Sequence, residues 1–176
     1  MIDIETLDTT SRACILSIGI VYFNLEEGVI KTSYILPEVQ NQLDGNRRVR
    51  AATLDFWMQQ NIDAKKDIFS SNTAKVSTEY AIGQLREIDQ ADLIFSHDPD
   101  LDLGAIIDFY NQFADDNTVD LFSYRKKRCF RTIKNLYDPS GKLRKRANVE
   151  HNALEDALSQ VNHLMKIVKK FEIELR

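Results

Sequence analysis

The segment 13–24 most constrains the fold of this 176-residue chain. It is rich in β-branched and aromatic residues, so it predicts a buried β-strand. A shorter strand is expected over 2–5, and a third over 29–36 follows at the separation of a β-hairpin. An antiparallel sheet is therefore predicted at the start of the chain.

After this hairpin, the spacing of apolar residues mostly predicts helices. The clearest case is the C-terminal segment, where Asn152 followed by Glu155 is close to a capping box at a helix start. Its apolar stripe is expected to consist of Leu154, Leu158, Val161, Met165 and Val168. Thr53 is expected to cap another helix that runs to about Gln60.

Shorter elements are expected between these segments. Helices are predicted over 78–89 and 103–113, strands over 92–96 and 127–131, and a loop over 39–50. The alternation of strands and helices predicts an α/β fold, with a mixed sheet flanked by helices. We find no linker-like composition, so residues 1–176 are expected to form a single domain.

Composition limits the compartment and the class of partner. Two cysteines do not make a disulfide framework, which predicts a reducing, cytoplasmic location. No apolar run approaches the ~18 residues of a membrane-spanning helix, so no membrane partner is expected. The net charge of −4 argues against a general nucleic-acid coat protein. A nuclease stays compatible with it, because bound cations offset the charge of their carboxylate ligands.

Two acidic side chains lie two residues apart on the first predicted strand. Asp3 and Glu5 therefore point to the same face. Like charges this close are unfavourable unless a cation lies between them. The pair predicts a cation site, and the alternative is two solvated acids near the end of the chain.

Further candidates follow later in the sequence. Asp102 comes after a predicted short strand, where α/β sheets hold ligands, although a helix cap in a solvated turn is the alternative. His151 and Asp156 flank a helix start, and a loop histidine beside a carboxylate suits a general base. The alternative is an ordinary exposed histidine. His97 and His163 lack this context and are expected to be structural or exposed.

Taken together, these residues resemble the motifs of the DEDDh 3′→5′ exonucleases, which belong to the ribonuclease H-like superfamily. Asp3-Ile4-Glu5 is similar to the first motif and Asp102 to the second. His151 with Asp156 is similar to the third.

Two phrases narrow the resemblance to the branch that contains the Rv2179c-like exoribonucleases and phage exodeoxyribonuclease A. They are Phe56-Trp57-Met58-Gln59-Gln60 and Arg131-Thr132. The second motif departs from the family pattern, because Asp98 and Leu101 replace its usual glycine and phenylalanine. Asp100 therefore stays an alternative to Asp102 as the ligand.

The resemblance implies a ribonuclease H-like fold and a metal-dependent activity. The expected reaction is hydrolysis from the 3′ end of single-stranded DNA or RNA, with release of nucleoside 5′-monophosphates. Two divalent cations, Mg²⁺ or Mn²⁺, would be held by Asp3, Glu5, Asp102 and Asp156. His151 would be the general base.

Substrate contacts are also implied. The backbone N–H groups of Thr6 and Leu7 would hold the last nucleotide. Further contacts are expected from Trp57, Gln60, Arg131, Arg144 and Arg146. Burial in the core explains Trp57 equally well, and a solvated loop is the alternative for Arg144 and Arg146.

The sequence leaves several alternatives open. Hydrolysis of dinucleotides, a non-catalytic nucleic-acid-binding module and a structural protein with incidental acids all compete with the exonuclease. The relatives include bacterial and phage proteins, so a bacterial cytoplasm or a phage-infected host is expected. They are often two-fold dimers, which makes a homodimer compatible with the resemblance.

Overall fold

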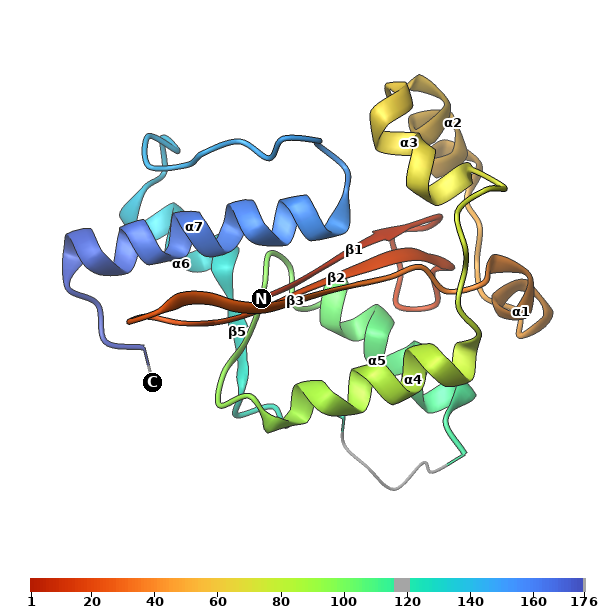
Figure 1. Cartoon of the computed structure of the whole chain (residues 1–176), viewed down its shortest axis with the longest axis horizontal. Helices are drawn as coiled ribbons and strands as arrows, with labels where there is room; N and C mark the ends of the chain where they lie inside the picture. Colours follow the sequence, from red (N-terminus) through yellow and green to blue (C-terminus); the bar gives the residue numbers. More distant parts are fainter. Residues whose placement is uncertain (116–120, 176) are drawn as a thin grey trace.

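The computed structural model describes residues 1–115 and 121–175. Its centre is a five-stranded mixed sheet with the order β3-β2-β1-β4-β5 (Figure 1). The strands are β1 (Ile2–Thr6), β2 (Ile15–Asn24), β3 (Gly28–Ile35), β4 (Ile94–Ser96) and β5 (Lys127–Cys129). The β1–β2 and β2–β3 pairs are antiparallel, whereas β1–β4 and β4–β5 are parallel.

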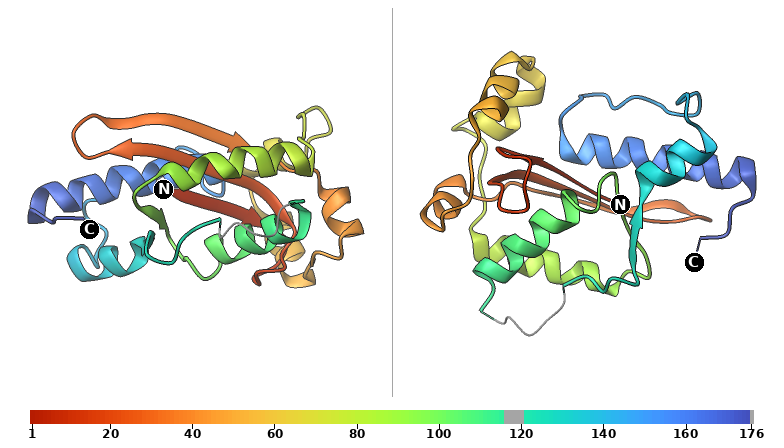
Figure 2. Two further views of the ribbon diagram at one scale, coloured as in Figure 1. Left: turned by 90° about the horizontal axis from the view of Figure 1, so that it is seen from below. Right: turned by 180° about the vertical axis from the view of Figure 1, so that it is seen from behind.

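Helices cover both faces of this sheet, as Figure 2 shows from below and from behind. One face carries α6 (Phe130–Tyr137) and α7 (Ala153–Phe171). The other carries α4 (Thr78–Arg86), the 3₁₀-helix η1 (Glu87–Gln90) and α5 (Asp102–Phe113). Each face has its own cluster of buried apolar side chains. The predicted α/β fold, with a mixed sheet flanked by helices, is confirmed and is consistent with a ribonuclease H-like architecture.

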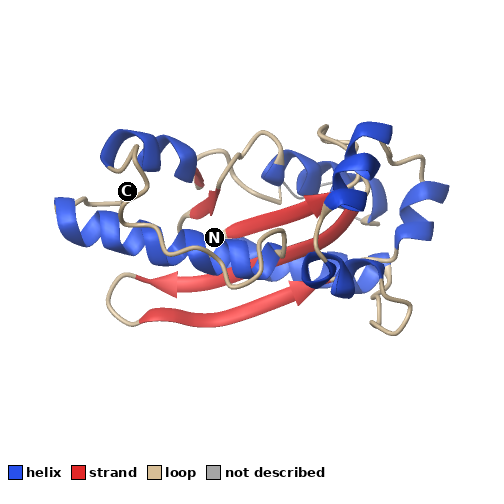
Figure 3. Cartoon of the chain, turned by 90° about the horizontal axis from the view of Figure 1, so that it is seen from above, coloured by secondary structure: helices blue, strands red, loops and turns tan. Residues whose placement is uncertain are grey.

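Three short helices lie near the C-terminal end of β1. They are α1 (Val39–Asp44), α2 (Ala51–Gln59) and α3 (Ile62–Phe69). Figure 3 shows α7 crossing above the strands, with α2 and α3 beyond its N-terminal end. The three helices therefore lie at the same end of the sheet as the N-terminus of α7.

The predicted loop over 39–50 is wrong, because α1 forms within it. Helix α1 is fixed by a polar side chain that apolar periodicity does not reveal. The buried Gln42 amide accepts from the Ile15 N–H and donates to the Ile15 carbonyl, both at 2.8 Å. The predicted cap at Thr53 is also wrong, since Arg50 is the residue that precedes α2.

The strand predicted over 127–131 is shorter than expected, because Phe130 already begins α6. Arg131 therefore lies on a helix. Cys14 and Cys129 are both free cysteines. In the described parts of the chain, no helix has the length and apolar character needed to cross a membrane.

Helix α7 begins where the sequence predicts it. The Asn152 side chain accepts from the Leu154 and Glu155 N–H groups, both at 3.1 Å. The buried face differs from the predicted stripe, because Leu154 is only half-buried whereas Ala153 and Ala157 are fully buried. Small side chains at these positions bring the start of α7 close to the sheet.

Candidate functional site

The alternation of β1 places two carboxylates on one face of the sheet. Ile2 and Ile4 are buried in the core against α4 and α5, so Asp3 and Glu5 face the side covered by α7. Helix α7 supplies Asp156 to the same place. One ligand oxygen from each of these three acids lies within 4.8 Å of the others. The structure therefore brings together three of the predicted acids.

Asp102 interacts electrostatically with Asp3 and Glu5 from the helix that follows the neighbouring strand β4. Because β1 and β4 are parallel, their carboxyl ends lie at the same edge of the sheet. Asp102 begins α5 just after β4, is 6% exposed, and accepts from the Asp98 N–H at 2.9 Å. Asp100 is exposed instead. The placement thus favours Asp102 over Asp100 as the second-motif acid.

Burial and mutual repulsion favour the protonated carboxyls in this cluster. Burial, followed by the charges of Asp102, Glu5 and Asp156, raises the pKa of Asp3 well above its ordinary value. Burial is also the main cause that raises the pKa of Glu5 to about 8 and that of Asp102 to about 7. The pKa of Asp156 is raised in the same way.

A divalent cation relieves this repulsion and binds deprotonated carboxylates. The ligand atoms are all carboxylate oxygens, which hard cations such as Mg²⁺ and Mn²⁺ prefer. The donor set therefore fits the metal that the resemblance implies.

His151 lies directly before the N-cap of α7. Its backbone has φ 62°, which is uncommon for a residue other than glycine, and its N–H donates to Asp156 Oδ2 at 3.0 Å. The imidazole meets Phe56 edge-on, with ring centroids 5.0 Å apart, and Trp57 at 6.3 Å. These contacts hold the predicted general base beside Asp156.

A cavity of about 250 Å³ opens at the carboxylates. Besides Asp3, Glu5 and Asp156, its lining includes His97, Lys134, Arg144 and Gln160. The Gln160 side-chain N–H donates to Asp3 Oδ1 at 2.7 Å. Gln160 follows Asp156 by one helical turn, so helical spacing could have revealed it. His97 and Lys134 carry no comparable sequence signal.

The other predicted substrate residues do not all lie at the cavity. Arg144 lines the cavity, whereas Arg146 is exposed and lies outside its lining. Arg131 is exposed on α6 and pairs with Asp98 Oδ2 at 3.0 Å. The Gln60 amide donates to a backbone carbonyl of α2 at 3.1 Å.

Two predicted nucleotide contacts are not available in this arrangement. The Leu7 N–H already donates to the Cys14 carbonyl at 2.9 Å, so it cannot hold a nucleotide. Trp57 is 2% exposed and its indole N–H donates to the Thr6 carbonyl at 3.0 Å. The indole ring therefore has no open face for a base, and the alternative of burial in the core is confirmed. The Thr6 hydroxyl donates to the Asp8 carbonyl at 2.6 Å.

The two remaining histidines differ from each other. His163 is structural, as predicted, because it is 1% exposed and its Nε2 lies 2.8 Å from Asp138 Oδ2. His97 lies at the end of β4 and lines the cavity, so the sequence-based expectation missed its position.

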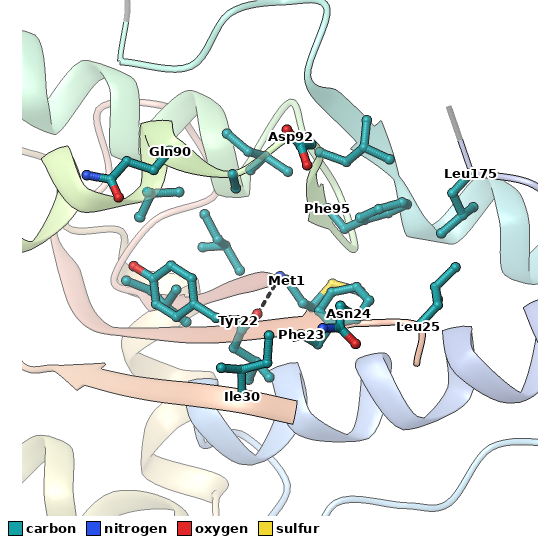
Figure 4. A pocket seen from close by; sticks show the side chains of 17 residues that line it. Met1, Tyr22, Phe23, Asn24, Leu25, Ile30, Gln90, Asp92, Phe95 and Leu175 are labelled. Carbon is teal, nitrogen blue, oxygen red and sulfur yellow. Dashed lines mark hydrogen bonds between the residues drawn. The ribbon is translucent and has the colours of Figure 1, made fainter. Parts of the chain in front are cut away.

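A larger cavity of about 560 Å³ lies between β2 and β4 (Figure 4). Its lining is mostly apolar and includes Phe23, Ile30 and Phe95. The Met1 amino group donates there to the Val21 carbonyl at 2.8 Å, and burial lowers the pKa of this amine to about 5. Within the described residues, the metal-ligand cluster lies in the smaller cavity. Chemistry, rather than size, therefore identifies the candidate site.

Comparison with known families agrees with this geometry. The family model of the 3′-5′ exoribonuclease Rv2179c-like domain matches residues 1–168. A comparison with curated proteins finds no match. The matched range contains all four acids and His151. The chain belongs to the Rv2179c-like 3′-5′ exoribonuclease domain family.

Proposed function

We propose that this chain is a metal-dependent 3′→5′ exoribonuclease of the DEDDh type, which releases nucleoside 5′-monophosphates from single-stranded RNA. The observation that carries this proposal is the convergence of Asp3, Glu5 and Asp156 within 4.8 Å. Asp102, which is buried, and His151, whose N–H donates to Asp156, complete the group. The family supports the direction of attack and the choice of RNA.

Asp3, Glu5, Asp102 and Asp156 would hold two Mg²⁺ or Mn²⁺ ions. Such ions, when bound, neutralise developing charge on the phosphate and lower the pKa of a coordinated water. No cysteine takes part in the cluster, which disfavours zinc.

His151 acts as the general base in this proposal. It accepts the proton of the attacking water, and the Asp156 carboxylate, which interacts electrostatically with His151, stabilises the imidazolium that forms. The hydrogen bond from Gln160 to Oδ1 fixes the orientation of the Asp3 carboxylate within the cluster.

Digestion of 5′-labelled RNA and DNA in parallel tests the proposal. With Mn²⁺, we expect the RNA to give a ladder that shortens from the 3′ end, and chelator to stop it. His151→Ala should slow cleavage by roughly 10²–10⁴-fold, which is the usual contribution of a general base. Endonucleolytic fragments, shortening from the 5′ end or faster digestion of DNA would contradict the proposal.

Binding of Mn²⁺ is expected to weaken as the pH falls from 8.5 to 6. The pKa values of about 8 for Glu5 and about 7 for Asp102 mean that binding must displace protons in this range. For each proton that the metal must displace, the apparent Kd rises about tenfold for every unit by which the pH falls. Calorimetric titration at several pH values measures this slope. A pH-independent Kd would show that the carboxyls are already ionised.

The same linkage predicts how pH affects the metal-free protein. Since the pKa of Glu5 rises from 4.5 to about 8 on folding, the folded chain binds more protons between these values. The contribution of Glu5 to the free energy of unfolding therefore falls as the pH rises through this window. The Met1 amine acts in the opposite direction, because its pKa is lowered. Glu5→Gln removes only the carboxyl, so its Tm should fall less between pH 5 and 8 than the wild-type Tm.

A further inference from the structure

One wall of the catalytic cavity is cationic, opposite in character to the carboxylate cluster. Lys134 of α6 and Arg144 line it, together with His97. Burial, followed by the charges of Lys134, Arg131 and Arg144, lowers the pKa of His97 to about 4. The imidazole is therefore neutral, and the basic groups around it leave the wall with net positive charge.

Two buried polar atoms of this cavity lack a hydrogen-bond partner among the described residues. They are His97 Nε2 and Gln160 Oε1. Gln160 is 9% exposed, and its amide nitrogen is already used by Asp3. Buried polar atoms are rarely left unpaired in folded proteins. A ligand that enters the cavity would satisfy both.

The His97 ring has a fixed position. It follows β4, and it packs against the buried Phe130 ring with centroids 6.1 Å apart. Because Phe130 begins α6, the same helix also carries Lys134 to the cavity one turn later. The imidazole and the ammonium group are thus presented together by rigid elements.

We propose that His97, Lys134 and Arg144 form a second phosphate site, which binds the phosphate next to the scissile one along the strand. Neutral imidazole N–H, ammonium and guanidinium groups are all donors to phosphate oxygens. Gln160 Oε1 is an acceptor, so it pairs with a sugar hydroxyl of the same nucleotide. This inference rests on the proposed function, because the carboxylates define where the scissile phosphate lies.

Two dinucleotides with the same bases test this site. One carries a 5′-phosphate and the other a 5′-hydroxyl, so only the first presents a second phosphate. We expect wild-type protein to bind the phosphorylated form on the order of tenfold or more tightly, as for charge-assisted hydrogen bonds. Titration calorimetry with Ca²⁺, under conditions where no cleavage is detected, measures both Kd values.

Variants assign this preference to particular side chains. Lys134→Ala and His97→Ala should each lose most of it, and Lys134→Arg should keep it. Lys169→Ala, at the exposed end of α7, is the matched control and should behave like wild type. With Mn²⁺, the loss should lie in KM rather than in kcat. On longer RNA, Lys134→Ala should reduce the slope of log Kd against log salt by about 0.7.

The outcomes separate this site from the proposed function. Equal binding of both dinucleotides by wild type would overturn the phosphate site, and so would an unchanged preference in folded Lys134→Ala and His97→Ala. Preference for the phosphorylated form without cleavage of dinucleotide or longer RNA by any metal would support the site and overturn the exonuclease. Melting curves of each variant show whether it is folded.

Discussion

An Asp3→Asn variant is expected to cleave RNA about a thousandfold more slowly, which is the scale for removal of one preorganised electrostatic contact. The amide cannot supply the negative charge that a bound cation needs. Its metal-free form should nevertheless melt at a higher temperature than wild type. Burial and the charges of Asp102 and Glu5 disfavour ionised Asp3, and a neutral side chain of the same shape removes this cost. Asn can still accept the hydrogen bond from Gln160.

Asp100→Asn provides the matched control, because Asp100 is exposed two residues before the buried Asp102. We expect its cleavage rate to stay within about twofold of wild type, as for a surface substitution. Asp102→Asn should instead lose activity comparably to Asp3→Asn. Single-turnover rates with Mn²⁺ and scanning calorimetry measure both effects. If Asp100→Asn were the inactive variant, Asp100 would be the second-motif ligand.

The parts of the site that depend on local geometry could be predicted from the sequence. A spacing of two residues on a strand is enough to put Asp3 and Glu5 on one face. An asparagine before an amphipathic helix is enough to place His151 and Asp156 at its start. These features need no knowledge of distant segments.

Features that depend on distant segments could not be predicted in the same way. Lys134 and His97 meet only because β4 and β5 pair side by side, which brings α6 to the cavity. The buried Arg47 likewise shows no pattern in the sequence. It donates to the Ala13 carbonyl at 2.8 Å and pairs with Asp108 at 2.9 Å, which ties the α1 region to α5. Polar contacts of this kind also explain why the periodicity of apolar residues did not predict α1.

Gly19→Ala is expected to impair both stability and catalysis, although it adds a single methyl group. Gly19 pairs with Asp3 in the β1–β2 register. A Cβ atom at position 19 would overlap backbone atoms of Ala153 and Leu154 in the first turn of α7. The start of α7 must then move away from the sheet and carry Asp156 away from Asp3. Overpacking of this kind costs about 1–3 kcal/mol in the free energy of unfolding.

A displacement of about 1 Å at the carboxylates would slow cleavage on the order of a hundredfold. Gly83→Ala is the control, because a Cβ atom there has no neighbour within 4 Å, and alanine at this exposed position stabilises helix α4 by up to about 1 kcal/mol relative to glycine. It should keep wild-type activity and melt slightly higher. If Gly19→Ala lost Mn²⁺ affinity while still folded, the close approach of α7 to β2 would be what assembles the acids. Wild-type Tm and rate in Gly19→Ala would show instead that Asp156 reaches the cluster without that approach.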